Sequence, residues 1–320
     1  MWEPKYVTLV SGESPCQVVE GLADGFIRWL GKERVRLHLE LGPSCNNTEF
    51  ECYQPVYDWF LNGTWDWEYA QSEILIISMR SVDKLKEWFT SKRFSCPLVT
   101  VDVRDRPPDD TVIFDPPIAP LQIPFRRELS QTLQNLDVFP APFGIVPEEL
   151  PPLKPYTERD ISVLLMGGKS NCTRPAYAQV LDKIPGAKVS VGGHISRKEY
   201  LSDLANAKIG AACYGAGFAT YRYLEVPYYQ SLLVAQPLPL LFPHNFRHGK
   251  EALFFNSPEE LLDTVNWALE HPVESEAIAK AAHLKLMQHH LTIHRAQWMA
   301  QIVEARVKEY EASKLLEFPW

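Results

Sequence analysis

The sequence predicts an α/β protein of two domains, each built on a mainly parallel sheet. The chain has 320 residues, whereas about 100–200 residues are usual for one domain. Short β-rich runs alternate along it with stretches of helical length, which is typical of βαβ units. A proline-rich segment divides this alternation into two similar halves, so we expect two domains of the same class.

In the first half, a turn at residues 11–15 follows the first predicted strand and opens a helix that extends through about Leu30. A second, amphipathic helix is expected over Val82–Thr90. Four runs are the predicted strands: Tyr6–Val10, Arg34–Leu41, Glu73–Ser78 and Pro97–Asp102.

The segment between the halves contains six prolines from Pro140 to Pro155. Such density suits a semi-rigid linker and excludes a central strand, because proline has no N–H to donate. We therefore predict domains at residues 1–150 and 151–320.

The second half repeats the alternation more regularly. Five runs are its predicted strands: Ile161–Met166, Ala187–Val191, Ile209–Cys213, Leu232–Ala235 and Leu253–Phe255. Six segments are its predicted helices: Pro175–Lys183, Arg197–Ala207, a segment from near Ala219, Pro258–Glu270, Glu274–His289 and Thr292–Ser313.

Charge and composition exclude several function classes. The formal net charge is −8, with dispersed Lys and Arg, whereas a nucleic-acid reader usually has a basic footprint. The longest apolar runs are strand-sized, and the first residues do not resemble a signal peptide, so we expect a cytoplasmic protein without a membrane span. Six scattered cysteines form no CxxC pair, so no metal site is expected, and Cys16, Cys96 and Cys213 suit buried free thiols.

Candidate binding residues lie on loops that follow strands, where open α/β sheets bind ligands. Gly167 and Gly168 directly follow a strand and would let backbone N–H groups approach a phosphate. Lys169 and Arg174 could pair with the same anion. A tight turn with surface bases is the alternative explanation.

The segment Tyr214–Glu225 is the most informative part of the chain. A glycine-rich loop leads into a predicted helix on which Arg222 and Glu225 lie three residues apart, and therefore on one face. The cation could bind a diphosphate while the carboxylate accepts hydrogen bonds from a ribose diol. An ordinary surface ion pair explains the spacing equally well.

The pattern Gly-x-Gly-Phe-x-Thr-x-Arg-x-x-Glu at 215–225 resembles the donor site of CgeB-like (spore-protein-type) glycosyltransferases, relatives of the group 1 enzymes with the GT-B fold. Further landmarks follow in the family's order over residues 158–300. They are Leu165–Gly168 with Arg174, Tyr200-Leu201 with Ala207–Gly210, His248–Glu251, Phe254-Phe255, Ser257–Leu261, and His290 with Thr292 and Arg295.

The resemblance implies two Rossmann-like domains facing a cleft, and a last helix at about 297–314 that packs back on the first domain. It implies a nucleoside-diphosphate sugar as co-substrate, a hydroxyl acceptor, and no metal or other cofactor. The donor-binding residues that it and the loop positions indicate are Gly167, Gly168, Lys169, Arg174, His194, Gly215, Gly217, Phe218, Thr220, Tyr221, Arg222, Glu225 and His248.

One departure limits what the resemblance implies. Many group 1 enzymes have a second glutamate eight residues before the equivalent of Glu225, where this chain has Gly217. The sugar, the nucleotide base and the stereochemical outcome are therefore not carried over.

Candidates for catalysis are less specific. Arg222 would stabilise the leaving diphosphate, and Glu13 or Asp102, which follow strands of the first half, could deprotonate an acceptor hydroxyl. Aromatic residues at 57–60 and 65–69 suggest either an acceptor platform or ordinary packing.

Three other functions remain compatible with the sequence. The first is a non-catalytic GT-B scaffold that binds a nucleotide or glycan, which Gly217 favours. The second is a phage-type enzyme that glycosylates a nucleic-acid base, which the net charge disfavours. The third is sugar-nucleotide epimerisation.

Overall fold

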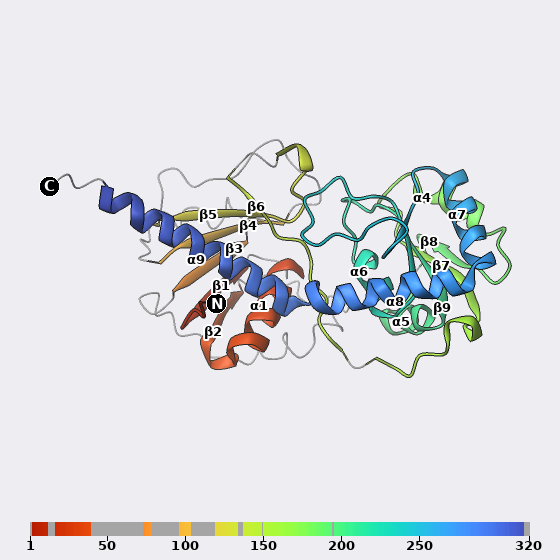
Figure 1. Cartoon of the computed structure of the whole chain (residues 1–320), viewed down its shortest axis with the longest axis horizontal. Helices are drawn as coiled ribbons and strands as arrows, with labels where there is room; N and C mark the ends of the chain where they lie inside the picture. Colours follow the sequence, from red (N-terminus) through yellow and green to blue (C-terminus); the bar gives the residue numbers. More distant parts are fainter. Residues whose placement is uncertain are drawn as a thin grey trace. The chain divides into compact units, whose positions relative to one another are not determined.

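The structure is a computed structural model of the whole chain (Figure 1). It describes residues 2–11, 17–39, 73–78, 96–103, 119–133, 137–148, 150–193 and 195–316. The chain divides into two compact units: residues 1–146 with 292–320 form unit 1, and residues 147–291 form unit 2. The division after Val146 lies close to the predicted boundary after residue 150.

Unit 1 is built on a parallel sheet of six strands in the order β2-β1-β3-β4-β5-β6. Its strands are β1 (Val7–Ser11), β2 (Val35–Leu39), β3 (Ile74–Ser78), β4 (Leu98–Asp102), β5 (Gln122–Arg126) and β6 (Phe139–Pro140). The first four coincide with the predicted strands. Apart from β2, whose residues alternate between apolar and polar, these strands are mainly apolar because a parallel sheet is covered on both faces, and all five residues of β4 are buried.

The last two strands of unit 1 were not predicted, because each contains a proline. Pro124 is tolerated in β5 because β6 pairs only from Phe125 onward, so no partner strand requires its missing N–H. β6 is two residues long and lies at the sheet edge, where Pro140 fits.

Two helices that are distant in sequence pack together in unit 1: α1 (Gln17–Leu30) and α9 (Thr292–Leu316) (Figure 1). A Cβ on Gly25 of α1 would lie 2.2 Å from the Thr292 carbonyl oxygen and 3.1 Å from the Ala296 Cβ. The helices therefore approach closely only because residue 25 is glycine. α9 begins at Thr292, five residues before the 297–314 implied by the resemblance.

The start of α9 is tied to unit 1 by the Thr292 and Arg295 pair noted in the sequence. Thr292 N donates to Ile145 O at 3.0 Å, and its hydroxyl donates to the buried Asp24 carboxylate at 2.5 Å. Arg295 Nε donates to Phe143 O at 2.9 Å. Thr292 and Arg295, two of the three residues of this landmark, thus have a structural role.

Unit 2 is built on a parallel sheet of five strands in the order β11-β10-β9-β7-β8. Its strands are β7 (Ile161–Gly167), β8 (Lys188–Val191), β9 (Ala207–Ala212), β10 (Leu232–Ala235) and β11 (Leu253–Phe254), each close to its predicted position. Counted from its first strand, this is the 2-1-3-4-5 winding of a flavodoxin-like sheet. The chain therefore reverses direction across the sheet between β7 and β9.

Helices cover both faces of this sheet. They are α4 (Arg174–Leu181), α5 (Arg197–Ala205), α6 (Arg222–Tyr228), α7 (Pro258–Glu270) and α8 (Pro272–His289). Val163, Ile209 and Ala211 point to the face that packs with Tyr177 of α4. Gly210 points to the opposite face, where a Cβ would lie 2.3 Å from Val226 Cγ2 of α6. The helices that follow β7 and β9 thus lie on opposite faces.

The helix expected from near Ala219 begins at Arg222 and ends at Tyr228. Thr220 therefore lies in the loop before α6 rather than on it. Cys96 and Cys213 are buried free thiols, as predicted, whereas Cys172 is exposed. No helix in the described part of the chain has both the length and the apolar character needed to cross a membrane.

Candidate functional site

The two predicted glycine loops lie together at the point where unit 2 reverses its winding. Gly167 ends β7 and Gly168 begins the loop after it, and the loop after β9 contains Gly215 and Gly217. Their strands are neighbours, and the helices that follow them diverge to opposite faces. In open α/β sheets this arrangement leaves a crevice at the carboxyl ends of the strands, where ligands bind.

Arg174 links the two loops through hydrogen bonds to their backbone carbonyls. Its Nε donates to Tyr214 O at 2.8 Å and its Nη1 to Gly168 O at 2.9 Å, while Nη2 lies 3.4 Å from Cys213 O. Asn171 adds a second link by donating to Gly215 O at 3.2 Å. Burial, with repulsion from Arg222, lowers the pKa of Arg174. Its donors are directed to loop carbonyls, so it fixes the loop geometry.

Close packing around Arg174 explains two of the glycines. A Cβ on Gly167 would lie 2.8 Å from Arg174 Nη1, and one on Gly215 would lie 3.1 Å from Nη2. Gly168 has open space where a Cβ would be, so its backbone can be approached from outside. Gly217 is buried, and its carbonyl accepts from Gly215 N at 2.8 Å in a tight turn.

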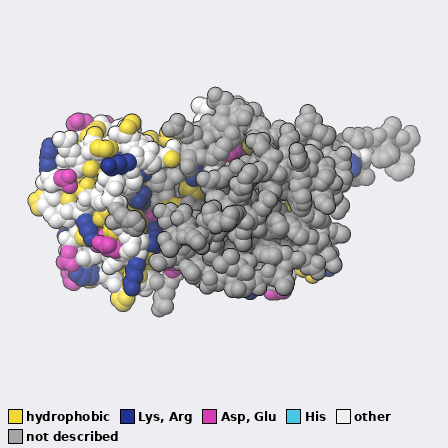
Figure 2. Space-filling view, turned by 180° about the vertical axis from the view of Figure 1, so that it is seen from behind, with side chains coloured by type: hydrophobic (Ala, Val, Ile, Leu, Met, Phe, Trp, Pro, Cys, Tyr) yellow, Lys and Arg dark blue, Asp and Glu magenta, His cyan; other side chains and the backbone are white. Residues whose placement is uncertain are grey.

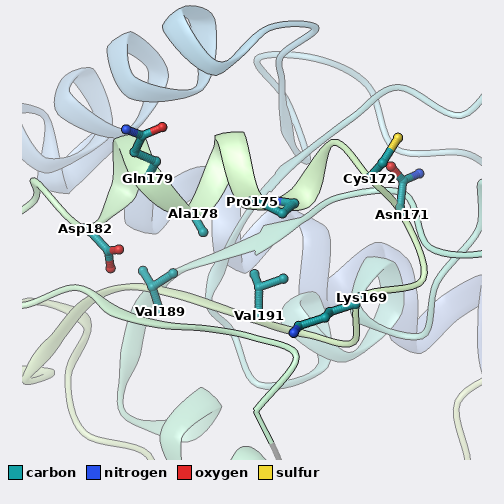
Figure 3. Close-up of a pocket in the computed structure, with 9 residues that line it drawn as sticks. All are labelled: Lys169, Asn171, Cys172, Pro175, Ala178, Gln179, Asp182, Val189 and Val191. Carbon is teal, nitrogen blue, oxygen red and sulfur yellow. The ribbon is translucent and has the colours of Figure 1, made fainter.

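Lys169 extends from the loop after β7 across the end of β8. A Cβ on Gly192, which has φ +80°, would lie 2.4 Å from Lys169 Cε. The side chain reaches into a groove of about 510 Å³, which Figure 3 shows between α4 and β8. Val189 and Val191 line the β8 side. The groove lies beside the loop after β7, and neither Arg222 nor Glu225 lines it. Of the predicted residues, Lys169 is the one that extends from this loop into the groove.

Glu225 is a buried carboxylate held by two side chains of α5. It is 4% exposed, and its Oε1 forms an ion pair with Arg197. Its Oε2 accepts from the Tyr200 hydroxyl at 2.9 Å. Burial and the nearby Glu225 charge raise the pKa of Tyr200 well above its usual value, so Tyr200 remains a donor. Glu225 is thus not the surface partner of an i,i+3 pair.

Arg222 begins α6 and lies beside the same cluster. Its guanidinium lies 5.5 Å from the centroid of the Tyr200 ring, and that of Arg197 lies 5.6 Å away, within the range of cation–π attraction. Its buried Nε has no hydrogen-bond partner in the described ranges, and no ion pair there joins it to Glu225. Arg222 is therefore a cation at this point with donor capacity left for a ligand.

The residues between Gly217 and Arg222 shape the loop before α6. Phe218 packs edge-on against Tyr214, with ring centroids 5.1 Å apart. The Thr220 methyl lies beside Gly215, and Tyr221 occupies the position before the helix without a side-chain cap.

His248 lies in an exposed turn and accepts from Phe254 N at 2.9 Å through Nδ1. In the neutral ring, Nε2 therefore carries the proton. His194 and Glu13 lie outside the described residues, as do the predicted helix 82–90 and the aromatic segments 57–60 and 65–69.

Asp102 ends β4 and is 6% exposed. Its carboxylate lies 3.5 Å from Arg126 Nε in a buried ion pair, and its carbonyl accepts from Arg127 N. The Asp102 carboxylate is thus paired with a buried arginine, and its role as a general base stays a prediction.

Sequence reasoning missed Arg197 and the site contact of Tyr200. Ser196 caps α5 by accepting from Glu199 N at 3.1 Å, so the motif Ser-x-x-Glu was a readable helix start. It places Arg197 and Tyr200 one turn apart on α5. Their approach to Glu225 depends on how the sheet places α5 beside α6, which the local sequence does not indicate.

The face of unit 2 seen in Figure 2 carries charges of both signs. Figure 2 shows Lys and Arg interspersed with Asp and Glu over the described part of unit 2. Within the described ranges, no three His, Cys, Asp or Glu side chains are grouped so that they could hold a metal ion.

Comparison with known proteins gives one family match. Residues 153–301 match the model of a family described as "Glycosyl transferase-like", which covers most of unit 2 and the start of α9. No curated protein sequence matches the chain significantly.

Solved structures share the fold over nearly the whole chain. Sucrose-phosphate synthase from Thermosynechococcus elongatus has a TM-score of 0.59 at 10% identity, covering 95% of this chain and 100% of that one. Anabaena Alr3699/HepE in complex with UDP-glucose has 0.57 at 11%, covering 93% and 99%. T4 phage BGT with its UDP-glucose substrate has 0.51 at 10%, covering 94% and 99%. The fold is thus the predicted one: two parallel α/β sheets that match GT-B glycosyltransferase structures.

Proposed function

We propose that this protein is a glycosyltransferase that moves a sugar from a nucleoside diphosphate to a hydroxyl acceptor. The observation that carries the proposal is the pair of glycine loops at the β7/β9 reversal, followed on α6 by Arg222 and the buried Glu225. The family match over residues 153–301 supports the same activity. The narrower likeness to CgeB-like enzymes is part of the proposal.

In this proposal, Glu225 accepts hydrogen bonds from the donor's ribose hydroxyls. Arg222, Lys169 and the N–H groups of Gly168 and its neighbours bind the diphosphate. Arg174 acts on the donor through the loops, since its guanidinium holds their carbonyls.

The reaction breaks the bond between the anomeric carbon and the diphosphate oxygen, which leaves with the electron pair. The acceptor oxygen forms the new bond to that carbon, and its proton passes to a base. Negative charge grows on the leaving diphosphate, so cations fixed in advance lower the barrier. Arg222 has this role, because its donors are not fully used within the described chain.

Thermal unfolding with UDP, GDP, dTDP, ADP and CMP, each beside a sugar conjugate, tests the binding step. A ligand that binds only the folded state adds about 2.7 kcal/mol at a hundredfold excess over Kd. We expect one nucleotide to stabilise the wild type and to lose that effect in Glu225→Gln. No shift with any nucleotide would refute the proposal.

Release of the nucleoside diphosphate from the donor so identified tests the chemical step. Arg222→Ala should lower kcat by about 10²-fold or more, the usual effect of removing a transition-state donor, with a smaller change in KM. Unchanged turnover would exclude this role for Arg222. The same assay with EDTA tests the further proposal that no metal is required.

A non-catalytic scaffold is the second candidate, favoured by Gly217 and by the buried pairing of Asp102 with Arg126. It would bind the nucleotide and its sugar conjugate without hydrolysis or transfer. The proposal includes a cytoplasmic location, which the free thiols Cys96, Cys172 and Cys213 support.

A further inference from the structure

Two helices of unit 2 meet through polar side chains at the carboxyl end of the sheet. Arg197 and Tyr200 lie on α5, and Arg222 and Glu225 lie on α6. In each helix the two residues are three apart and share one face. These four side chains form a cluster of two guanidiniums, one phenol and one carboxylate, in which the carboxylate of Glu225 is buried.

The hydrogen bonds to Glu225 are divided evenly between its oxygens. Arg197 Nη1 donates to Oε1, and the Tyr200 hydroxyl donates to Oε2 at 2.9 Å. An ionised carboxylate has about four lone-pair sites, two on each oxygen. One acceptor site therefore remains on each oxygen, and the two donors fix the plane in which these sites lie.

Two adjacent acceptor sites in one plane match a ligand with two adjacent hydroxyls. Each hydroxyl of a vicinal diol donates to one oxygen, so both remaining sites are used. A ligand that lacks one hydroxyl leaves an acceptor unfilled on a buried group, which costs free energy. Discrimination then requires that the carboxylate be both charged and held still.

The two α5 side chains meet these two requirements. A carboxylate that is 4% exposed is costly to keep ionised without an opposite charge, and Arg197 supplies that charge. The Tyr200 ring lies beside both guanidiniums, and its hydroxyl fixes the second oxygen. Without them, the Glu225 carboxylate could rotate, and its remaining acceptor sites would no longer face the ligand.

We infer that Arg197 and Tyr200 are positioning residues that hold the Glu225 carboxylate paired and oriented, and thereby make the site selective for ribonucleotide donors over 2′-deoxyribonucleotide donors. The inference rests on the proposed function, since it assigns a substrate class to that same site. Neither α5 residue needs to touch the donor for this role.

The test measures Kd by calorimetry for UDP, GDP, ADP and CDP on the full chain. The tightest of them is then compared with its 2′-deoxy counterpart. We expect the wild type to prefer the ribonucleotide by about tenfold or more, as for one lost hydrogen bond to a charged group. Arg197→Gln and Tyr200→Phe should reduce the preference to within about threefold, while Arg197→Lys, which keeps the charge, should recover part of it.

Asp203→Asn is the matched control. It removes an ion pair of the same helix, in which Asp203 lies 2.6 Å from Lys188, without touching Glu225. It should leave the preference unchanged, and melting curves show that each variant is folded. A merely structural role for Arg197 and Tyr200 would weaken both nucleotides equally and keep the ratio.

The outcomes separate the inference from the proposed function. If the wild type binds none of these four nucleotides, nor dTDP or CMP, the proposed function fails and the inference fails with it. If it binds one without preferring the ribose form, or if the preference survives in both α5 variants, the inference alone is overturned.

Discussion

Glu20 in unit 1 and Glu225 in unit 2 are both buried glutamates, on the helices that follow β1 and β9, but their surroundings differ. Glu225 is 4% exposed and has an arginine and a tyrosine as partners. Glu20 is 2% exposed, and neither of its carboxylate oxygens has a hydrogen-bond partner in the described ranges. Burial raises the pKa of Glu20 to about 7.

This difference teaches that the chain stabilises buried carboxyl groups in two ways. In unit 2 the buried carboxylate is paired with a cation, Arg197. In unit 1 burial without a partner raises the pKa of the group to about 7 instead. One glutamate is therefore held in an ion pair, and the ionisation of the other depends on pH near neutrality.

The largest expected effect on stability comes from a substitution that forces α1, the helix that carries Glu20, away from α9. In Gly25→Ala, the new Cβ would meet the Thr292 carbonyl at 2.2 Å, and backbone atoms cannot move aside cheaply. We expect a loss of at least about 3 kcal/mol in the free energy of unfolding, measured by urea denaturation. Gly168→Ala, with open space at its Cβ, is the control and should cost far less; equal losses would contradict the close packing.

The second prediction concerns Glu20 directly. Its pKa is about 7 in the folded state against an ordinary value of 4.5, so the folded state holds the proton more tightly. The contribution of this group to stability is fully present below about pH 4.5 and is lost as the pH rises through 7. The difference between these two pKa values corresponds to about 3 kcal/mol.

Glu20→Gln replaces the neutral acid with a neutral group of similar size. We expect it to leave stability nearly unchanged at pH 4.5 and to raise it by about 3 kcal/mol above pH 8. Denaturation across this pH range measures the difference, and the exposed Glu33→Gln is the control. A variant that follows the wild type at every pH would show that Glu20 is not buried as described.

The third prediction is that the same substitution has the opposite sign in unit 2. Glu225→Gln removes the charge that Arg197 pairs with, while the amide can still accept from Tyr200. Because the Arg197 side chain is 30% exposed, solvent screening limits the loss to about 2 kcal/mol. Urea denaturation at pH 8 measures it, and a gain in stability would erase the contrast between the two glutamates.

The smallest effect should follow Tyr200→Phe. It removes one hydroxyl that donates to Glu225 at 2.9 Å and keeps the ring beside the two arginines. We expect a loss of about 1 kcal/mol by the same measurement. A loss as large as that of Arg197→Gln would mean that the hydroxyl, rather than the ion pair, sustains the buried charge.

The sequence predicted most of the fold because apolar runs and glycine turns are local signals. It missed β5 and β6, since Pro124 and Pro140 are unfavourable in strands except where no partner needs their N–H. The helix of Arg222 was expected three residues too early because Ala219 and Thr220 are compatible with a helix that the glycine loop prevents.

The candidate site was predictable only where its residues are close in sequence. Gly215, Arg222 and Glu225 form one readable segment, but Arg197 lies 28 residues from Glu225 and meets it only because β8 and β9 flank β7. Similarly, α1, the helix that carries Glu20, packs against α9, whose Thr292 lies 268 residues after its hydrogen-bond partner Asp24. Contacts of that range depend on tertiary structure, which no local pattern encodes.

The pairing of α1 with α9 also has a consequence for biosynthesis. Unit 2 is an uninterrupted stretch inserted into unit 1, and the two points of interruption are joined by the hydrogen bond from Thr292 N to Ile145 O. While the chain is being translated, residues 1–146 therefore emerge with the glycine face of α1 uncovered. All of unit 2, residues 147–291, has been synthesised before α9 leaves the ribosome, whereas unit 1 still lacks α9. The unit whose synthesis begins first is therefore the unit that completes its folding last.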